Sequence, residues 1–332
     1  MPPESFRCFH VRKTGNGTIE SSVESRPLHE LPPGEVLIRV QASSLNYKDA
    51  LAATGNPGVA RNFPHVPGID SAGIVETSDS GKFKPGDQVL CTGYEQGAGQ
   101  WGGWAEYVRL PADWVVPLPD GFTLDETMIL GTAGFTAAQS VLSLVEHHIE
   151  PDRGPIVVTG ATGGVGVISL MILSKLGYDV TAVSGKPDQY DWLKSLGASN
   201  VIGREEVDDT STKPLLKARW AGAVDTVGGN TLATIIRSLD HRGVAAACGL
   251  VGGTDLPLTV FPFILRGVKL DGIDSAHCPY DRRLQIWNLL AGDWKLDNLH
   301  DLATEIKIDE VDVTVDQMMQ GKTHGRHIVR PR

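Results

Sequence analysis

The run Ile156–Val167, "IVVTGATGGVGV", places glycines between a short apolar segment typical of a buried strand and an apolar segment typical of a helix. Glycine allows positive φ and lets the backbone approach a ligand, while the N-terminus of the following helix offers unpaired N–H groups to a phosphate. The context predicts a dinucleotide-binding turn. Because the spacing is GxxGGxG and not GxGxxG, a tight turn without a ligand is an alternative.

The segments that flank this turn keep the same rhythm. Short apolar runs such as "DVTAV" and "GAVDTV" alternate with helix-like runs such as "DQYDWLKSLGA" and "NTLATIIRSLD". This alternation predicts a parallel sheet with helices on both faces. Near the chain start, β-like runs such as "GEVLIRVQASSL" are separated by Gly and Pro turns, which indicates a mostly β domain. A helix is expected from about Thr123, because Thr123 and Glu126 have capping-box spacing.

The end of the second predicted strand bears on the choice of cofactor. The run "DVTAVSGK" ends in Ser184, Gly185 and Lys186, without the acid that binds the ribose 2′-hydroxyl in NAD-binding units. A hydroxyl and a cation suit a 2′-phosphate, so the sequence favours NADPH. Arg204, just after the next strand, is a second candidate cation. The alternative is that Lys186 is an ordinary solvated lysine.

Charge and composition exclude several classes of partner. The net charge is −10 and no long basic run occurs, which argues against nucleic acid and anionic membranes. The N-terminal run "MPPESFRCFHVRK" lacks the apolar region of a signal peptide, and "VISLMIL" is shorter than the roughly 20 residues of a membrane span. The cysteines have no CxxC spacing, as expected for reduced thiols in a cytoplasmic protein: Cys8, Cys91, Cys248 and Cys278.

Several longer motifs carry a resemblance. They include "SSLNYKDALAATG", "RNFPHVPGIDSAG", "WGGWAEY", "LGTAGFTA", "VVTGATGGVG" and "FPFILRGVKLDGIDS". The chain resembles the medium-chain dehydrogenase/reductase superfamily, and within it the zinc-free, quinone-oxidoreductase-like branch of NADPH-dependent acryloyl-CoA reductases. The resemblance implies an α/β protein with two domains. A GroES-like, mostly β catalytic domain spans residues 1–125 and 265–332, and a Rossmann domain with a doubly wound parallel sheet spans 126–264.

The resemblance also implies a set of NADPH contacts. On matching positions these are Tyr47, Thr162, Gly163, Gly164, Val165, Ser184, Gly185, Lys186, Arg204, Leu250, Ile264 and Ser275. The last three would line the nicotinamide side. The chain departs from the family at Gly321, where relatives place an asparagine, which puts a contact there in doubt.

A metal is not expected. Zinc alcohol dehydrogenases of the superfamily carry Gly-His-Glu after the "PG" turn, whereas this chain has Ile69 and Asp70 there. Zinc needs three or four ligands at set positions, and Cys91 and His65 do not supply them.

Chemistry without a metal suits the reduction of an activated C=C bond, for which the site must stabilise a developing oxyanion. The motif "NYKD" holds the candidate catalytic residues. Asn46 can donate a hydrogen bond, Tyr47 can donate a proton or only contact the cofactor, and Asp49 can orient its neighbours. The alternative for Asp49 and Lys48 is a helix cap or a surface ion pair.

The predicted reaction is the NADPH-dependent reduction of acryloyl-CoA to propanoyl-CoA. Arginines are available for the CoA phosphates, although this role rests on the resemblance: Arg61, Arg266, Arg282, Arg283 and Arg326. A quinone or enone reductase, or a non-catalytic NADPH-binding protein, are the alternatives. A homodimer is also expected: the run "VKLDGID" would lie at the edge of the Rossmann sheet, and in relatives such a strand pairs across a twofold axis. The alternative is an internal strand.

Overall fold

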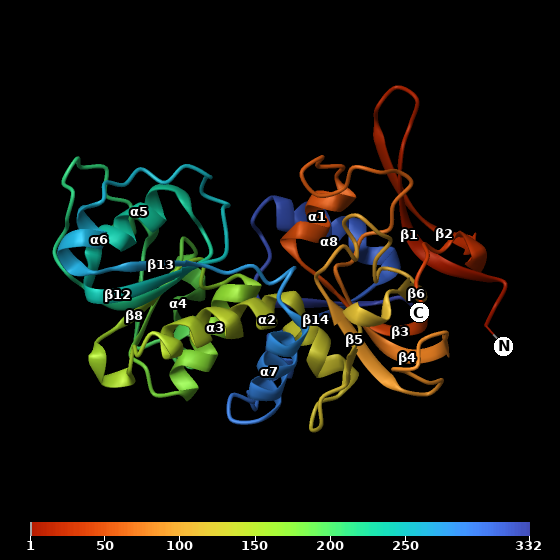
Figure 1. The fold of residues 1–332 in the computed structure, drawn as a ribbon. Coiled ribbons are helices and arrows are strands. Elements are labelled where there is room, and N and C mark those ends of the chain that lie inside the picture. The colour runs from red at the N-terminus through yellow and green to blue at the C-terminus, as the bar shows by residue number, and fades with distance from the viewer. Residues whose placement is uncertain (1) are drawn as a thin grey trace. The chain divides into compact units, whose positions relative to one another are not determined.

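The computed structural model describes residues 2–332, drawn in Figure 1, and they form two compact units. Unit 1 holds the residues up to Thr132 together with 276–292 and 297–332, and unit 2 holds 133–275 and 293–296. The predicted boundaries were 125/126 and 264/265. The later return to unit 1 follows from β13 (Lys269–Gly272), which pairs in parallel with β12 (Leu239–Ala247) and so belongs to the sheet of unit 2.

Unit 2 is built on a six-stranded parallel sheet in the order β10-β9-β8-β11-β12-β13. Its other strands are β8 (Ile156–Val158), β9 (Val180–Val183), β10 (Asn200–Ile202) and β11 (Trp220–Asp225). Every residue of β8, β9 and β11 is buried, as expected for strands covered on both faces. The strand order reverses between β8 and β11, and ligands of doubly wound sheets bind at the carboxyl ends of the strands beside such a point.

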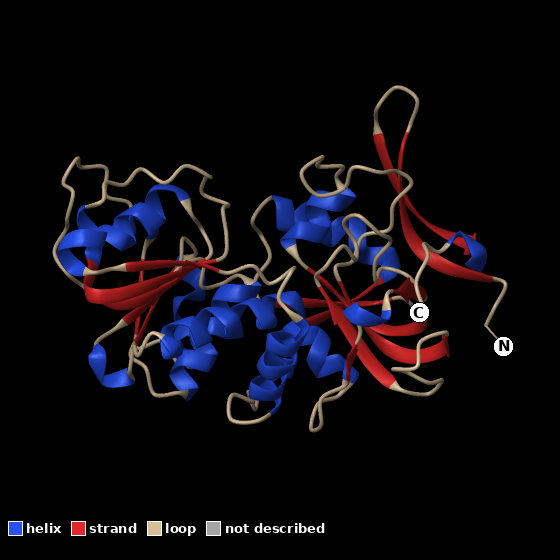
Figure 2. Ribbon diagram, viewed as in Figure 1, coloured by secondary structure: helices blue, strands red, loops and turns tan. Residues whose placement is uncertain are grey.

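The helices of unit 2 follow the predicted alternation with the strands. They are α3 (Gly164–Lys175), α4 (Tyr190–Ser195), α5 (Gly229–Ser238) and α6 (Phe261–Arg266). In Figure 2 they lie on both sides of the red strands of this unit.

Unit 1 is mostly β. Its larger sheet runs β14-β15-β3-β4-β5-β7, with β6 also paired to β3, and β1 and β2 form a separate hairpin. The strands are β1 (Ser5–Lys13), β2 (Ile19–Pro27), β3 (Val36–Leu45), β4 (Asp70–Ser78), β5 (Gln88–Thr92), β6 (Tyr107–Leu110), β7 (Val116–Pro117), β14 (Ala303–Lys307) and β15 (Arg326–Arg330). Its helices are α1 (Tyr47–Ala53), α7 (Tyr280–Ala291) and α8 (Val311–Met319).

Both ends of the chain contribute neighbouring strands to this sheet. The last strand, β15, pairs antiparallel with β3, so that His327 lies opposite Leu45. Trp104 is fully buried beside this pairing, packs edge-on against Phe9 and donates from Nε1 to the carbonyl of Ser44 at 2.9 Å. The predicted class, a mostly β domain from both chain ends plus a parallel-sheet α/β domain, is confirmed.

Helix α2 (Leu124–Glu146) carries the predicted capping box at its start and an interruption near its first third. Thr123 and Glu126 exchange hydrogen bonds of 2.8 and 3.2 Å, and Gly131 then adopts φ 53° and ψ −156°. By length and composition α2 could cross a membrane, which the sequence prediction overlooked. However, 83% of its most apolar window is buried inside the protein, which is typical of a core helix.

Candidate functional site

The glycine turn of unit 2 has the geometry of an anion site. Gly160 has φ +57°, which favours glycine, and any side chain at Gly166 would collide with the backbone of Gly160 and Ala161. Helix α3 begins at Gly164 with no acidic residue in its first turn. The first amides of a helix have no partner within the helix, so this end can bind a phosphate. Thr162 is buried in the turn, Gly163 is exposed, and Gly164 and Val165 are half-buried.

A carboxylate fixes the strand ends beneath this turn. Asp225, at the end of β11, is fully buried and accepts hydrogen bonds of 2.7 Å from the hydroxyl of Thr159 and from the amide of Gly228. Burial raises the pKa of the Asp225 carboxyl. Sequence reasoning missed this residue, whose only local signal is the motif "DTVGG" after an apolar strand.

The predicted 2′-phosphate residues lie together at the ends of β9 and β10. Ser184 is buried and its hydroxyl accepts from the amide of Lys186 at 3.1 Å. The Arg204 side chain lies over Gly185, where a methyl group would come within 2.5 Å of Arg204 Nε. Partial burial, and then the charge of Arg204, lower the pKa of Lys186. Two neighbouring cations at this position form a plausible anion site by geometry and charge.

The residues predicted for the nicotinamide side are less closely grouped. Leu250 follows β12 and Ser275 follows β13, so both lie beyond the carboxyl ends of parallel strands. The glycine turn also lies at this end of the strands. Leu250 is exposed and Ser275 is half-buried. Ile264 lies on α6 with its side chain 68% exposed.

Unit 1 holds a buried polar network around Asn46. The side-chain nitrogen of Asn46 donates to Asp70 at 2.8 Å and to Asp49 at 3.1 Å, while its oxygen accepts from Arg326 Nη1 at 3.1 Å. Asp70 also accepts from the hydroxyl of Ser44 and from the amide and hydroxyl of Thr132. The nitrogen of the Asn46 amide faces acceptors and its oxygen faces a donor, so the hydrogen bonds fix the orientation of the amide.

Arg326 is the buried cation of this network. Arg326 is 3% exposed, and its Nε donates to the carbonyl of Ile129 at 2.7 Å. Burial lowers the pKa of Arg326, while the charges of Asp70 and Asp49 act in the opposite direction. Within residues 2–332, no protein group accepts a hydrogen bond from Nη2. A buried donor of this kind is costly unless it receives a partner, and Nη2 has almost no accessible surface, so a ligand oxygen could bind it only after its neighbours move.

Asp49 and Tyr47 differ sharply in accessibility. Asp49 is fully buried, and its oxygens accept from the amides of Asn46, Gly68 and Ile69. Burial, together with the charge of Asp70, raises the pKa of Asp49 to about 7. Asp49 therefore caps α1 and anchors the "PG" turn, whereas Tyr47 is 44% exposed at the start of the same helix.

Comparisons with known proteins agree with both units. Residues 32–120 match the alcohol dehydrogenase GroES-like domain, and residues 164–291 match the zinc-binding dehydrogenase family. The acrylyl-CoA reductase AcuI of Ruegeria pomeroyi is 43% identical over 95% of each chain. The chain belongs to the medium-chain dehydrogenase/reductase family.

Two further relatives place the chain in the quinone-oxidoreductase-like branch of that family. The Bacillus subtilis protein YhfP, provisionally named a quinone oxidoreductase, is 45% identical over 98% of each chain. Its structure with NAD bound has a TM-score of 0.96, with 99% of this chain and 100% of that chain covered. The YhdH oxidoreductase of Salmonella enterica in complex with NADP is 43% identical with a TM-score of 0.95, covering 98% of this chain and 99% of that one.

The zinc ligands of the family's alcohol dehydrogenases have no counterpart cluster here. Within the described residues 2–332, no group of three or more His, Cys, Asp or Glu side chains could hold a metal ion. Cys91 is fully buried, and burial raises the pKa of its thiol to about 12. His65 is buried and its Nε2 lies 2.9 Å from the carbonyl of Gly97. Asp70, which follows the "PG" turn, takes part in the Asn46 network instead.

The arginines proposed for the CoA phosphates have varied surroundings. Arg283 is fully buried, donates to the carbonyl and hydroxyl of Thr92 and lies over the ring of Tyr94, so it is unsuited to a phosphate. Arg266 donates to three backbone carbonyls of unit 2 and is likewise committed. Arg61 is exposed and Arg282 is half-buried. The doubtful position Gly321 is exposed beyond the end of α8.

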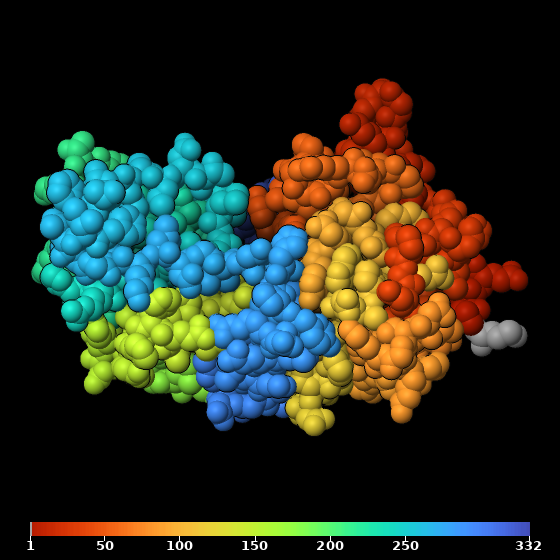
Figure 3. All heavy atoms as spheres, viewed as in Figure 1, coloured from red at the N-terminus to blue at the C-terminus, as the bar shows by residue number. Residues whose placement is uncertain are grey.

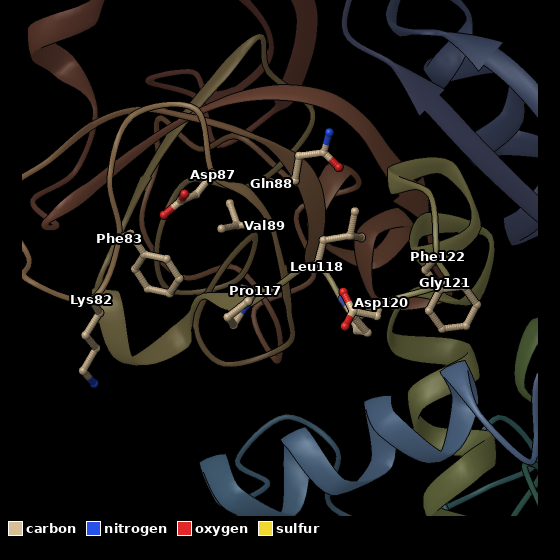
Figure 4. A pocket seen from close by; sticks show the side chains of 11 residues that line it. Lys82, Phe83, Asp87, Gln88, Val89, Pro117, Leu118, Asp120, Gly121 and Phe122 are labelled. Atoms are coloured by element: carbon tan, nitrogen blue, oxygen red, sulfur yellow. The ribbon is translucent and has the colours of Figure 1, made fainter.

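A separate hollow of about 480 Å³ lies in unit 1, over β5 and β7. Figure 4 shows Phe83, Leu118 and Phe122 among its lining side chains. None of the residues of the Asn46 network lines it.

Proposed function

We propose that this chain is an NADPH-dependent oxidoreductase that reduces the C=C bond of acryloyl-CoA to give propanoyl-CoA. The observation that carries the proposal is Arg326, a buried guanidinium beside Asn46 whose Nη2 has no acceptor in the described chain. Such a donor suits the thioester oxygen of an enoyl substrate, on which negative charge develops, and binding requires that the substrate displaces the atoms that now cover Nη2. The names of the AcuI relatives and the NADP of the Salmonella structure support the same reaction and cofactor.

Unit 2 would bind the cofactor. The first-turn amides of α3, at Gly164 and Val165, would bind the pyrophosphate, and Lys186 and Arg204 would bind the 2′-phosphate. NADPH supplies a hydride to the β-carbon of the enoyl thioester when it is bound. Leu250, Ile264 and Ser275 remain proposed contacts on the nicotinamide side.

Unit 1 would stabilise the substrate during this transfer. As hydride adds to the β-carbon, the π electrons move to the thioester oxygen and form an enolate, which Arg326 Nη2 would stabilise by a charged hydrogen bond. Asn46 would hold Arg326 through Nη1, and Asp49 would act as a positioning residue through Asn46. The enolate then takes a proton at the α-carbon, with exposed Tyr47 or water as the donor.

The test measures NADPH oxidation with acryloyl-CoA, crotonyl-CoA and a simple quinone in parallel, with NADH as a second cofactor. The proposal predicts preferred turnover of acryloyl-CoA with NADPH. Equal or exclusive activity on the quinone would refute the CoA assignment and favour the quinone reductase suggested by the name of the Bacillus relative. If NADPH raises the melting temperature but no acceptor is reduced, a non-catalytic binding protein is the better description.

A homodimer and a cytoplasmic location belong to the same proposal. β13 is the edge strand of the unit 2 sheet and carries the exposed Leu270. Further exposed apolar residues lie at the start of the preceding helix α6 and along it: Val260, Ile264 and Leu265. In Figure 3 the residues near 260–270 form part of the visible surface of unit 2. An open edge with apolar flanks is suited to pairing with a second copy across a twofold axis. The free thiols of Cys8, Cys91 and Cys248 are consistent with a reducing compartment.

A further inference from the structure

Gly131 interrupts α2 beside the Asn46 network. Its φ of 53° and ψ of −156° lie in a region that is essentially restricted to glycine. The interruption turns the next residue, Thr132, toward Asp70. The Thr132 amide donates to both carboxylate oxygens at 3.0 and 2.9 Å, and its hydroxyl donates to Oδ1 at 2.6 Å. The unusual backbone of Gly131 therefore gives Asp70 a large share of its hydrogen bonds.

The missing side chain of Gly131 is as important as its backbone. A Cβ at this position would lie 2.5 Å from Asp70 Oδ2, 2.9 Å from Arg326 Nη2 and 2.9 Å from Ser44 Oγ. Non-bonded carbon atoms do not approach polar atoms so closely, so even a methyl group would displace at least one of these side chains. The bare Cα of Gly131 thus adjoins Asp70, Arg326 and Ser44 at once.

Two of the side chains that adjoin Gly131 carry opposite charges. Asp70 carries the carboxylate and Arg326 the guanidinium, and both are buried. The oxygens of Asp70 are already satisfied by the neutral donors of Ser44, Asn46 and Thr132. Arg326 Nη2 keeps no acceptor in residues 2–332. If Asp70 rotated away from Thr132, it could pair directly with Nη2 and occupy the donor.

We propose that Gly131 is a positioning residue that keeps Arg326 Nη2 unpaired with Asp70, so that the acyl oxygen of the substrate can bind Nη2 once substrate entry uncovers it. It does so in two ways: its backbone directs Thr132 onto Asp70, and its lack of a side chain leaves Arg326 and Asp70 in place. The inference rests on the proposed function for the identity of the oxygen, an enoyl thioester carbonyl. The contacts of Gly131 with Asp70 and Arg326 do not depend on that function.

The test is Gly131→Ala, with Gly86→Ala as the control. Gly86 is exposed and also has a positive φ, of +94°, but a Cβ there would meet nothing within 4 Å, so this variant strains the backbone without the contacts. We expect Gly131→Ala to lower kcat with acryloyl-CoA about 100-fold, the usual effect of losing one oxyanion donor, with KM for NADPH unchanged. Gly86→Ala should stay close to the wild-type kcat, and both variants should remain folded by circular dichroism.

A double-mutant cycle with Arg326→Lys separates positioning from a general structural effect. If Gly131 acts through Arg326, then Gly131→Ala should cost far less than 100-fold in the Arg326→Lys background. Independent, multiplying losses would overturn the inference, and so would wild-type kcat in Gly131→Ala.

Crystal structures of wild type and Gly131→Ala keep the inference testable if the proposed function fails. If the wild type reduces no enoyl thioester, the proposed function is wrong, and the crystal structures then decide the positioning role. A displaced Arg326 or Asp70 in the variant supports it. Unchanged positions of both side chains overturn it. If Gly131→Ala does not fold, Gly131→Ser is assessed by the same structural criterion. Loss of folding in both Gly131 variants, with Gly86→Ala folded, also counts against a positioning role.

Discussion

Asn46 donates from its side-chain nitrogen to Oδ2 of Asp70 at 2.8 Å. The same nitrogen also faces the Asp49 carboxylate, so Asn46 separates two buried acids. Replacing this nitrogen by an oxygen would bring three carboxylates together and leave lone pairs facing one another.

Asn46→Asp should therefore lower the free energy of unfolding by at least about 2 kcal/mol at pH 8, because two buried carboxylates lose a donor and a like charge is added beside them. Urea unfolding measures this change. Asn56→Asp is the control, since Asn56 is exposed and uses only its side-chain oxygen, as an acceptor from the amide of Gly58. Equal stability losses in the two variants would contradict the network.

Arg326→Lys should reduce kcat with acryloyl-CoA by roughly 10²- to 10³-fold, because a lysine ammonium cannot donate in the directions that Nε, Nη1 and Nη2 use together. KM for NADPH should hardly change. Steady-state kinetics tests this, with Arg330→Lys on the same strand as control. Arg330 pairs with Asp125 and Glu305 away from the Asn46 network, so its loss should leave kcat within a few-fold. Comparable losses in both variants would remove the special role of Arg326.

Lys186→Glu should weaken NADPH far more than NADH, because only NADPH carries the 2′-phosphate that the new carboxylate would repel. We expect KM for NADPH to rise by roughly 10-fold or more, in line with losing a charge-assisted contact. Lys217→Glu, an exposed lysine of the same unit, makes the same change of net charge elsewhere. If Lys186→Glu affects both cofactors alike, Lys186 does not bind the 2′-phosphate.

His327 should make the protein sensitive to acid. Burial, helped by the charge of Arg326, lowers the pKa of His327 to about 4 from the usual 6.5. The folded state thus holds His327 neutral. Its contribution to stability is complete above pH 6.5 and is lost as the pH falls through this window to 4, because the unfolded chain takes up the proton first.

This shift corresponds to about 3 kcal/mol at most. His327→Gln should therefore show a smaller loss of unfolding free energy between pH 7 and pH 4.5 than wild type, as measured by urea titration at both values. The same replacement at the exposed His29 is the control. A wild-type slope in His327→Gln would show that this histidine is not the acid-sensitive group.

The proposed dimer interface can be disrupted without touching either site. Leu270→Lys on β13 should convert a dimer to a monomer, because a charge on an edge strand opposes strand pairing across it. Light scattering coupled to gel filtration measures the mass. Val313→Lys is the control, since Val313 is an exposed apolar residue on α8 of unit 1. A wild-type protein that is already monomeric would end the proposal.

The sequence was most informative about features that depend on the order of strands, helices and glycines along the chain. The alternation of apolar runs with helices predicted the parallel sheet, and the absence of an acid after "DVTAV" directed attention to Ser184, Lys186 and Arg204, which the structure places together. These features depend on residues close in sequence, or on neighbouring parallel strands whose carboxyl ends must meet at one edge. The capping box of α2 is local in the same way.

The proposed catalytic network is different, because its residues come from distant parts of the chain. Asn46, Asp70, Thr132 and Arg326 are joined only when β15 pairs with β3 and the interrupted α2 brings Thr132 to Asp70. The motif "NYKD" contributes Asn46 and Asp49 to this network, but it could not separate the buried helix cap Asp49 from the exposed Tyr47. The two-domain plan and the glycine turn could be predicted from the sequence, since both follow from local periodicity and glycine spacing. Which charges are buried beside one another could not be predicted, because burial and hydrogen-bond partners depend on long-range packing.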